Sequence, residues 1–148
     1  MGISAREFLK QEEQDNIKHA IMAAEMETSG EIRVHIENIC NGDVLDRAAY
    51  VFHHLKMTHT RLRNGVLIYL AIKHRKFAII GDKGIHRVVP ENFWDDIKEG
   101  MLNYFKKEEF AEGLCYAIMT TSEQLKKYFP RQADDTDELP DDISFGKD

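Results

Sequence analysis

Two short apolar segments in the middle of the chain limit its fold more than any other feature. Residues 66–72 and 77–80 are rich in Val, Ile, Leu, Tyr and Phe, and a charged tetrapeptide at 73–76 separates them. Such residues fit a pleated, buried surface, and each segment is too short for a long helix. We therefore predict an antiparallel hairpin at the centre of a sheet. The second strand ends on Gly-Asp-Lys-Gly at 81–84, where an acid lies between two glycines.

The residues before the hairpin predict a strand and a helix that lead into it. Residues Glu31–Glu37 alternate between polar and apolar side chains, which indicates a half-buried strand at an edge or with one solvated side. Asp43 then begins a helix whose apolar face runs to Leu55. A strand, helix and strand in this order form a right-handed crossover, so the first two strands should be parallel. The hairpin partner is then antiparallel to both, and the sheet is mixed.

Helical spacing of apolar residues predicts three further helices. One lies within residues 5–27 behind a capping box at 4–7, one starts at Pro90, and one follows a break at 106–108. Four helices around a small mixed sheet give an α/β fold, a three-layer α/β/α sandwich. We assign residues 1–129 to this single domain and residues 130–148 to an acidic C-terminal tail. The pattern does not place a fourth strand, and Ile143 and Phe145 could dock the tail on the body.

Charge and hydropathy exclude several classes of protein. The tail holds seven acids against two basic residues and so carries most of the net charge of −6. The rest of the chain is near neutral, whereas nucleic-acid binding requires a basic surface. No apolar segment approaches the ~20 residues that span a bilayer, and the N-terminus has no secretory signal. We therefore expect a cytoplasmic protein without a membrane span and without nucleic-acid binding.

Strand directions bring four acidic residues to one edge of the predicted sheet. Glu31 begins the first strand, Asp82 follows the hairpin, and Asp95 and Asp96 lie near the start of the next helix. Clusters of carboxylates suit Ca²⁺ or Mg²⁺, and glycines beside Asp82 would let backbone carbonyls approach an ion. The pattern therefore predicts a divalent-cation site formed by these four residues. Purely structural roles are the alternative, because acids near a helix start are common dipole partners and Gly-Asp-Lys-Gly is a common turn.

A second group of acids is predicted at the opposite edge and has weaker support. It comprises Asp43, Asp46, Glu108 and Glu109, of which the first two already have a capping role. The sequence contains no zinc motif, no Ser or Cys nucleophile motif and no dinucleotide fingerprint. Catalytic residues are therefore not assigned from motifs.

Several short motifs, in their order and spacing, resemble the TPM-domain family. They lie at residues 28–31, 64–68, 75, 81–85, 104–105 and 109–113. The resemblance extends over most of the body, and it implies a Rossmann-like α/β/α sandwich, divalent-cation binding and, as in the plant branch, acid phosphatase activity. Family members are often membrane-tethered or lumenal, and some are linked to photosystem II repair. This chain differs in lacking a signal or anchor and in having Gly-Asp-Lys-Gly where many members have a glycine–aromatic–glycine loop.

Three functional hypotheses follow. The first is a stand-alone TPM domain in which Ca²⁺ or Mg²⁺ at Asp82 orders residues 81–86 and regulates an unidentified protein partner. The alternative is a metal-assisted phosphomonoesterase, in which Arg63 or Arg75 would have to reach the phosphate. The third is a protein-interaction module that needs no ion and uses the acidic tail.

Overall fold

The computed structural model describes residues 4–133, 138–140 and 142–146. In this part of the chain, four strands form one mixed sheet in the order β3-β2-β1-β4. The strands are β1 (Glu31–Glu37), β2 (Gly65–Ala71), β3 (Lys76–Gly81) and β4 (Ile143–Phe145). The helices are α1 (Ala5–Phe8), α2 (Gln11–Glu27), α3 (Val44–His54), α4 (Lys83–His86), α5 (Asp95–Lys106) and α6 (Phe110–Leu125), with one 3₁₀ turn, η1 (Met57–His59).

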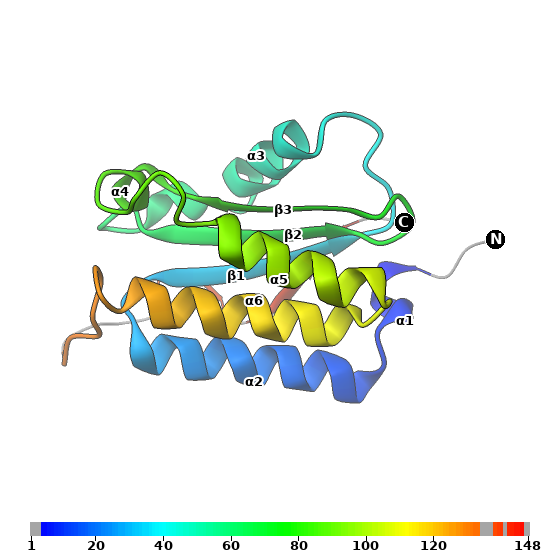
Figure 1. Cartoon of the computed structure of the whole chain (residues 1–148), viewed down its shortest axis with the longest axis horizontal. Helices are drawn as coiled ribbons and strands as arrows, with labels where there is room; N and C mark the ends of the chain where they lie inside the picture. Colours follow the sequence, from blue (N-terminus) through cyan, green and yellow to red (C-terminus); the bar gives the residue numbers. More distant parts are fainter. Residues whose placement is uncertain (1–3, 134–137, 141, 147–148) are drawn as a thin grey trace.

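The elements form three layers, as predicted. Helix α3 covers one face of the sheet, and α2, α5 and α6 cover the other (Figure 1). Strands β1 and β2 are parallel, with Glu31 opposite Gly65, and β2 and β3 are antiparallel, with Val66 opposite Gly81. The predicted crossover and hairpin are therefore confirmed. Six helices are present in the described residues rather than four, because α1 and α4 are single turns that a periodicity of 3.6 residues cannot reveal.

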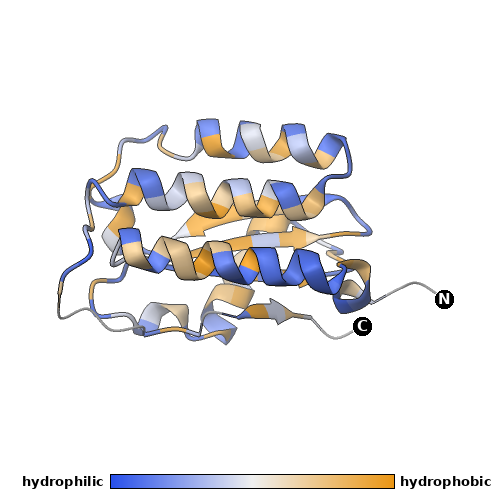
Figure 2. Ribbon diagram, turned by 90° about the horizontal axis from the view of Figure 1, so that it is seen from below, coloured by the Kyte–Doolittle hydropathy of each residue, from blue (hydrophilic) through white to orange (hydrophobic). Residues whose placement is uncertain are grey.

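The larger core lies between the sheet and the three long helices. Alternate residues of β1 and β2 enter it, among them Val34, Ile36 and Ile68, each fully buried. Helix α6 lies between α2 and α5, and hydrophilic residues mark the outer surfaces of these helices while the sheet behind them is apolar (Figure 2). Full burial of such aliphatic side chains contributes about 1.5–3 kcal/mol each, so this layer supplies much of the stability.

The smaller core lies between β2 and α3. The other face of β2 contributes Leu67 and Tyr69, which pack with Phe52 of α3 and with Met57 of η1. Because both faces of β2 are buried, all seven of its residues are buried. A strand covered on both faces reads as a continuous apolar run, which is why residues 66–72 stood out in the sequence.

Strand β1 corrects one expectation. We expected its polar residues at an edge or on a solvated side, but β1 lies between β2 and β4 and every one of its residues is buried. The cause is the C-terminal tail, from which Ile143 pairs with Val34 as part of β4 and Leu139 joins the smaller core. Alternation along a strand reports on its two faces and cannot show that a segment 100 residues away covers one of them.

The helix expected at Pro90 also needs correction. Residues 91–94 form turns, in which the Phe93 amide donates to the Pro90 carbonyl and the Asp95 amide donates to the Asn92 carbonyl, and α5 begins only at Asp95. Trp94 is buried at the end of these turns. Proline suits the first position of a helix and is also common in turns, so its presence alone did not decide between them.

Candidate functional site around Asp82

Asp82 lies at the edge of the sheet where β1 and β2 begin and β3 ends. Its amide donates to the carbonyl of Gly65 at 2.9 Å, and Gly65 is the residue opposite Glu31. The backbones of Glu31 and Asp82 thus flank Gly65 at one edge, as the predicted strand directions require. Asp82 also caps α4, because its Oδ1 accepts a hydrogen bond from the Lys83 amide at 2.8 Å.

The Asp82 carboxylate is paired with Arg63. Nε of Arg63 donates to Oδ2 at 2.6 Å, and Nη2 donates to Oδ1 at 2.8 Å. The Asp82 side chain is only 6% exposed, whereas that of Arg63 is 32% exposed. These hydrogen bonds raise the pKa of Arg63 above its usual value. The geometry is the two-pronged arrangement in which a guanidinium matches a carboxylate best.

Gly84 sets the position of the loop that carries Arg63. A Cβ atom on Gly84 would lie 2.2 Å from the carbonyl oxygen of Leu62 and 2.6 Å from that of Arg63. The Gly84 amide donates to the Arg63 carbonyl at 2.9 Å. Only a residue without a side chain allows this approach. We expected the glycines to let carbonyls reach an ion, and the structure instead brings the loop carbonyls against the backbone of α4.

The other three predicted ligands lie in different surroundings. Glu31 is buried, and its Oε1 accepts a hydrogen bond from the Glu138 amide at 2.9 Å. Asp95 and Asp96 are exposed in the first turn of α5, which packs on the face of the sheet opposite α3. Within residues 4–133, 138–140 and 142–146, no group of three or more His, Cys, Asp or Glu side chains is arranged to hold a metal ion.

A cavity of about 210 Å³ opens beside the Asp82–Arg63 pair. Both residues line it, together with Phe52 and His53 of α3 and with Thr58 of η1. Its wall therefore combines a carboxylate, a guanidinium, a hydroxyl and an imidazole. Such a wall can accommodate water and a small charged group.

The phosphatase hypothesis requires a free arginine, and both candidates have acidic partners. Arg63 binds Asp82, and Nη2 of Arg75 donates to Oε1 of Glu108 at 2.6 Å. In the second acidic group, Asp43 caps α3 as predicted, with its Oδ2 accepting from the Asp46 amide. Neither the Arg63–Asp82 pair nor the Arg75–Glu108 pair positions a nucleophile, so phosphatase activity stays a prediction from the resemblance.

Sequence reasoning missed a buried charged network at the far end of β1. Arg47 of α3 donates from Nε and Nη2 to the two carboxylate oxygens of Glu37, each at 2.8 Å. The Tyr69 hydroxyl donates to the same carboxylate, and Nε2 of His35 lies 3.2 Å from its Oε1. Nδ1 of His35 lies 2.9 Å from Oγ of Ser144 in the tail. The network joins α3, β1, β2 and β4.

This network changes the acid–base properties of its members. Burial by itself raises the pKa of Glu37, but hydrogen bonds from Arg47, His35 and Tyr69 outweigh burial and hold the pKa well below its usual range. Burial, followed by the hydrogen bond to Glu37, raises the pKa of Tyr69. Glu37 is therefore charged and Tyr69 neutral near neutral pH. The sequence signal was the alternation of polar residues along the first strand, which we had assigned to solvent.

Arg33 lies on the same face of β1 as Glu37. It differs from Arg47 in its hydrogen bonding. It is 8% exposed, and its Nε has no hydrogen-bond partner among the described residues. Burial lowers its pKa, and the nearby charge of Asp142 opposes that effect. Arg33 thus keeps a buried positive charge with incomplete hydrogen bonding.

The model of the TPM domain matches residues 4–124, which is most of the chain. The chain belongs to the TPM-domain family. The BA42 protein from the psychrophilic bacterium Bizionia argentinensis, whose structure was solved by NMR, is 51% identical in sequence to this chain. The two structures match with a TM-score of 0.90 over 95% of this chain and 97% of the BA42 chain. The predicted family is therefore confirmed.

Two more distant structures share the fold of this TPM domain. The N-terminal domain of a P. gingivalis protein is 18% identical with a TM-score of 0.67, and covers 82% of this chain and 78% of its own. The N-terminal domain of a Corynebacterium glutamicum protein is 14% identical with a TM-score of 0.64, and covers 79% and 74%. No curated protein matches the chain. Among the described residues, no helix is long and apolar enough to cross a membrane.

Proposed function

We propose that this TPM domain binds Ca²⁺ or Mg²⁺ through Asp82, and that the ion competes with Arg63 for the carboxylate. One observation carries the proposal: Asp82 is a buried carboxylate on the wall of a polar cavity, and its charge is balanced by a side chain that is 32% exposed. A buried carboxylate is costly unless it is hydrogen-bonded or paired with a positive charge. A divalent cation supplies that charge when Arg63 moves into solvent.

The ligands available near Asp82 suit a cation that keeps part of its water. Mg²⁺ commonly uses one or two carboxylates and retains several waters, whereas Ca²⁺ takes about 6–8 oxygen ligands. The cavity offers the Asp82 carboxylate and the Thr58 hydroxyl, with room for water. Of the four predicted ligands we therefore propose Asp82 as the primary one. Glu31 accepts a hydrogen bond from the Glu138 amide, and Asp95 and Asp96 are exposed in the first turn of α5.

Ion binding would change the loop that carries Arg63. This loop is held by the hydrogen bond from the Arg63 amide to Thr60 and by the bidentate pair with Asp82. Loss of the pair places a free guanidinium on the surface beside α3. A protein partner can distinguish the two states by that charge, which makes the domain a cation-dependent interaction module.

The test is a titration of the ¹⁵N-labelled chain with CaCl₂ and with MgCl₂ after treatment with EDTA. We expect saturable shifts of the amides of Arg63, Asp82 and Lys83 and a rise in melting temperature, because an ion that binds only the folded state stabilises it. The Asp82→Asn variant should lose both responses. Asp95→Asn makes the same chemical change on the opposite layer and should keep them.

Three outcomes would contradict the proposal. Unchanged amide shifts at millimolar Ca²⁺ and Mg²⁺ would exclude an ion at Asp82. A full response in Asp82→Asn would place the ion elsewhere. Loss of the response in Asp95→Asn as well would show that the ion needs the first turn of α5.

A further inference from the structure

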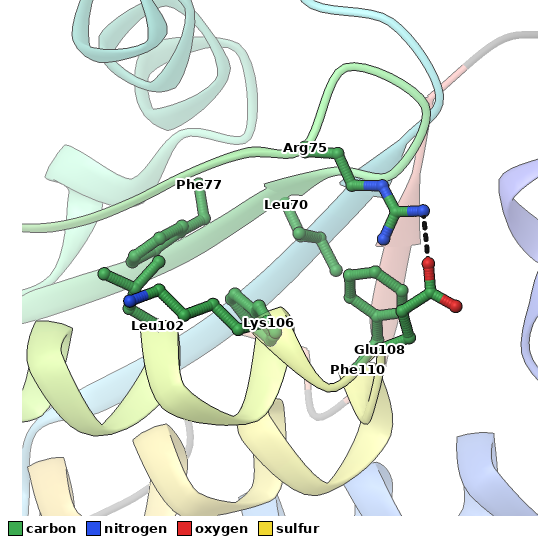
Figure 3. A pocket seen from close by; sticks show the side chains of 8 residues that line it. Leu70, Arg75, Phe77, Leu102, Lys106, Glu108 and Phe110 are labelled. Atoms are coloured by element: carbon green, nitrogen blue, oxygen red, sulfur yellow. Dashed lines mark hydrogen bonds and ion pairs between the residues drawn. The ribbon is translucent and has the colours of Figure 1, made fainter.

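An apolar pocket lies at the other end of β3 from Asp82, between the sheet and the C-terminal end of α5. Its volume is about 230 Å³. Leu70 and Phe77 of the hairpin form one side and Leu102 of α5 lies on the other (Figure 3). Phe105 of α5 also lines the pocket. Phe77 and Phe105 meet edge to face, with ring centroids 5.1 Å apart. Leu102 is 40% exposed, so an apolar surface is open to solvent at this point.

Three charged side chains surround the mouth of this pocket. Arg75, from the turn between β2 and β3, and Glu108, from the connection to α6, lie together at one end, whereas the amino group of Lys106, from the end of α5, lies at the other end beside Leu102 (Figure 3). Arg75 and Glu108 form an ion pair, and the Arg75 guanidinium lies 5.3 Å from the centre of the Phe110 ring. Lys106 has no acidic partner among the described residues. The mouth thus carries two cations and one acid.

Glu108 occupies a backbone position that usually belongs to glycine. Its φ is 61°, and it follows the last turn of α5, where its amide donates to the Phe105 carbonyl. Left-handed residues at this position of a helix end are most often glycine, because a side chain is unfavourable there. A glutamate at this position directs its carboxylate to Arg75 across the pocket mouth (Figure 3). The carboxylate of Glu108 is therefore the anionic group that Arg75 holds in this structure.

We propose that this pocket binds a small molecule with a ring-sized apolar body and a carboxylate. The apolar body packs against the Phe77 and Phe105 rings, and the carboxylate displaces Glu108 from Arg75 and is held by Arg75, with the exposed Lys106 side chain turning toward it. The volume suits a fragment-sized ligand, since pockets for drug-sized molecules are about 300–1,000 Å³. The net positive charge of the mouth selects carboxylates over amides and amines. The site is separate from Asp82 and needs no metal ion.

The experiment uses phenylacetate as the probe, with phenylacetamide as the uncharged molecule of the same shape. The ¹⁵N-labelled full chain is titrated with each in the presence of EDTA, so that the outcome is independent of any cation at Asp82. We expect saturable shifts at Phe77, Leu102 and Lys106 with phenylacetate and binding several-fold weaker with phenylacetamide. Shifts confined to other regions, or equal affinity for both molecules, would overturn the proposal.

Charge variants test the mouth of the pocket. Lys106→Gln should weaken phenylacetate and reduce the difference between the two molecules, whereas the neighbouring exposed Lys107→Gln should leave both unchanged. Glu108→Gln should tighten phenylacetate by about two- to fivefold, the factor that corresponds to release of an exposed ion pair. Equal effects of Lys106→Gln and Lys107→Gln, or weaker binding in Glu108→Gln, would contradict the assigned roles.

Discussion

Arg63 donates two hydrogen bonds to Asp82, at 2.6 and 2.8 Å, so the acid predicted to bind a cation already has a cationic side chain as its partner. The pair joins the loop before β2 to the residue after β3. Because Arg63 is partly exposed and Asp82 is not, the arginine is the member that can leave. Any cation that binds the Asp82 carboxylate must therefore compete with Arg63.

The first prediction concerns this competition. Arg63→Gln should increase the affinity of the domain for Ca²⁺ or Mg²⁺ by about fivefold, because the ion no longer displaces a partly exposed guanidinium. Isothermal titration calorimetry measures the change. Arg61→Gln removes the same charge from the same loop at an exposed position and should alter the affinity little. Unchanged or weaker binding in Arg63→Gln would mean that the ion and Arg63 do not share the carboxylate.

The second prediction compares two arginines on the α3 side of the sheet. Arg33→Met should leave the free energy of unfolding unchanged or raise it, because it removes a buried charge whose Nε has no partner. Arg47→Met should lower the free energy of unfolding by about 2–3 kcal/mol, because it leaves the Glu37 carboxylate without its main donor. Urea unfolding near neutral pH measures both. A large loss of stability in Arg33→Met would show that its interaction with Asp142 outweighs the cost of burial.

The third prediction is a pH dependence that arises from Glu37. Its pKa is lower in the folded state than in the unfolded state, so its contribution to stability is present above the unfolded pKa and is lost as the pH falls below that value. The unfolded pKa of a glutamate is about 4.3, so the loss should occur from about pH 5 downward. The difference in unfolding free energy between the native protein and Glu37→Gln should shrink over this range. A difference that does not change with pH would mean that the packing of the Glu37 side chain, and not its charge, provides the stabilisation.

The fourth prediction contrasts two glycines. Gly84→Ala should lower the free energy of unfolding by about 1–3 kcal/mol, because its Cβ would overlap the carbonyl oxygens of the loop that carries Arg63. Gly42→Ala has no atom within 4 Å of the new Cβ and no positive φ, so it should be neutral or stabilise the fold by up to about 1 kcal/mol. Thermal unfolding measures both. The amide of Arg63 should shift in Gly84→Ala only, and an equal shift in both variants would contradict the packing argument.

Much of the architecture could be predicted from local patterns. The buried hairpin, the parallel pairing of β1 with β2, the Asp43 cap and the family all follow from short segments of sequence whose side-chain types and spacing report on their own surroundings. The start of α5 could not be predicted, because Pro90 suits a turn as well as a helix. Helix α4 is a single turn, too short for a periodic signal.

The candidate site shows the same division. Strand directions correctly placed Glu31 and Asp82 at one edge, because topology follows from the order of elements. Which side chains pair depends on how closely the tertiary structure brings together residues that are far apart in the chain. Neither the pairing of Asp82 with Arg63 nor the contact of Glu31 with Glu138 follows from the order of strands.

The sequence by itself determined strands β1, β2 and β3, their mixed pairing, the long helices, and the presence of an acid between two glycines after β3. Only the tertiary structure decided that the tail adds β4 beside β1, that the polar residues of β1 are buried, and that Asp82 is neutralised by Arg63. The physical reason is range. Secondary structure reflects interactions between neighbours along the chain, whereas the burial and charge of a side chain depend on which distant segments pack over it.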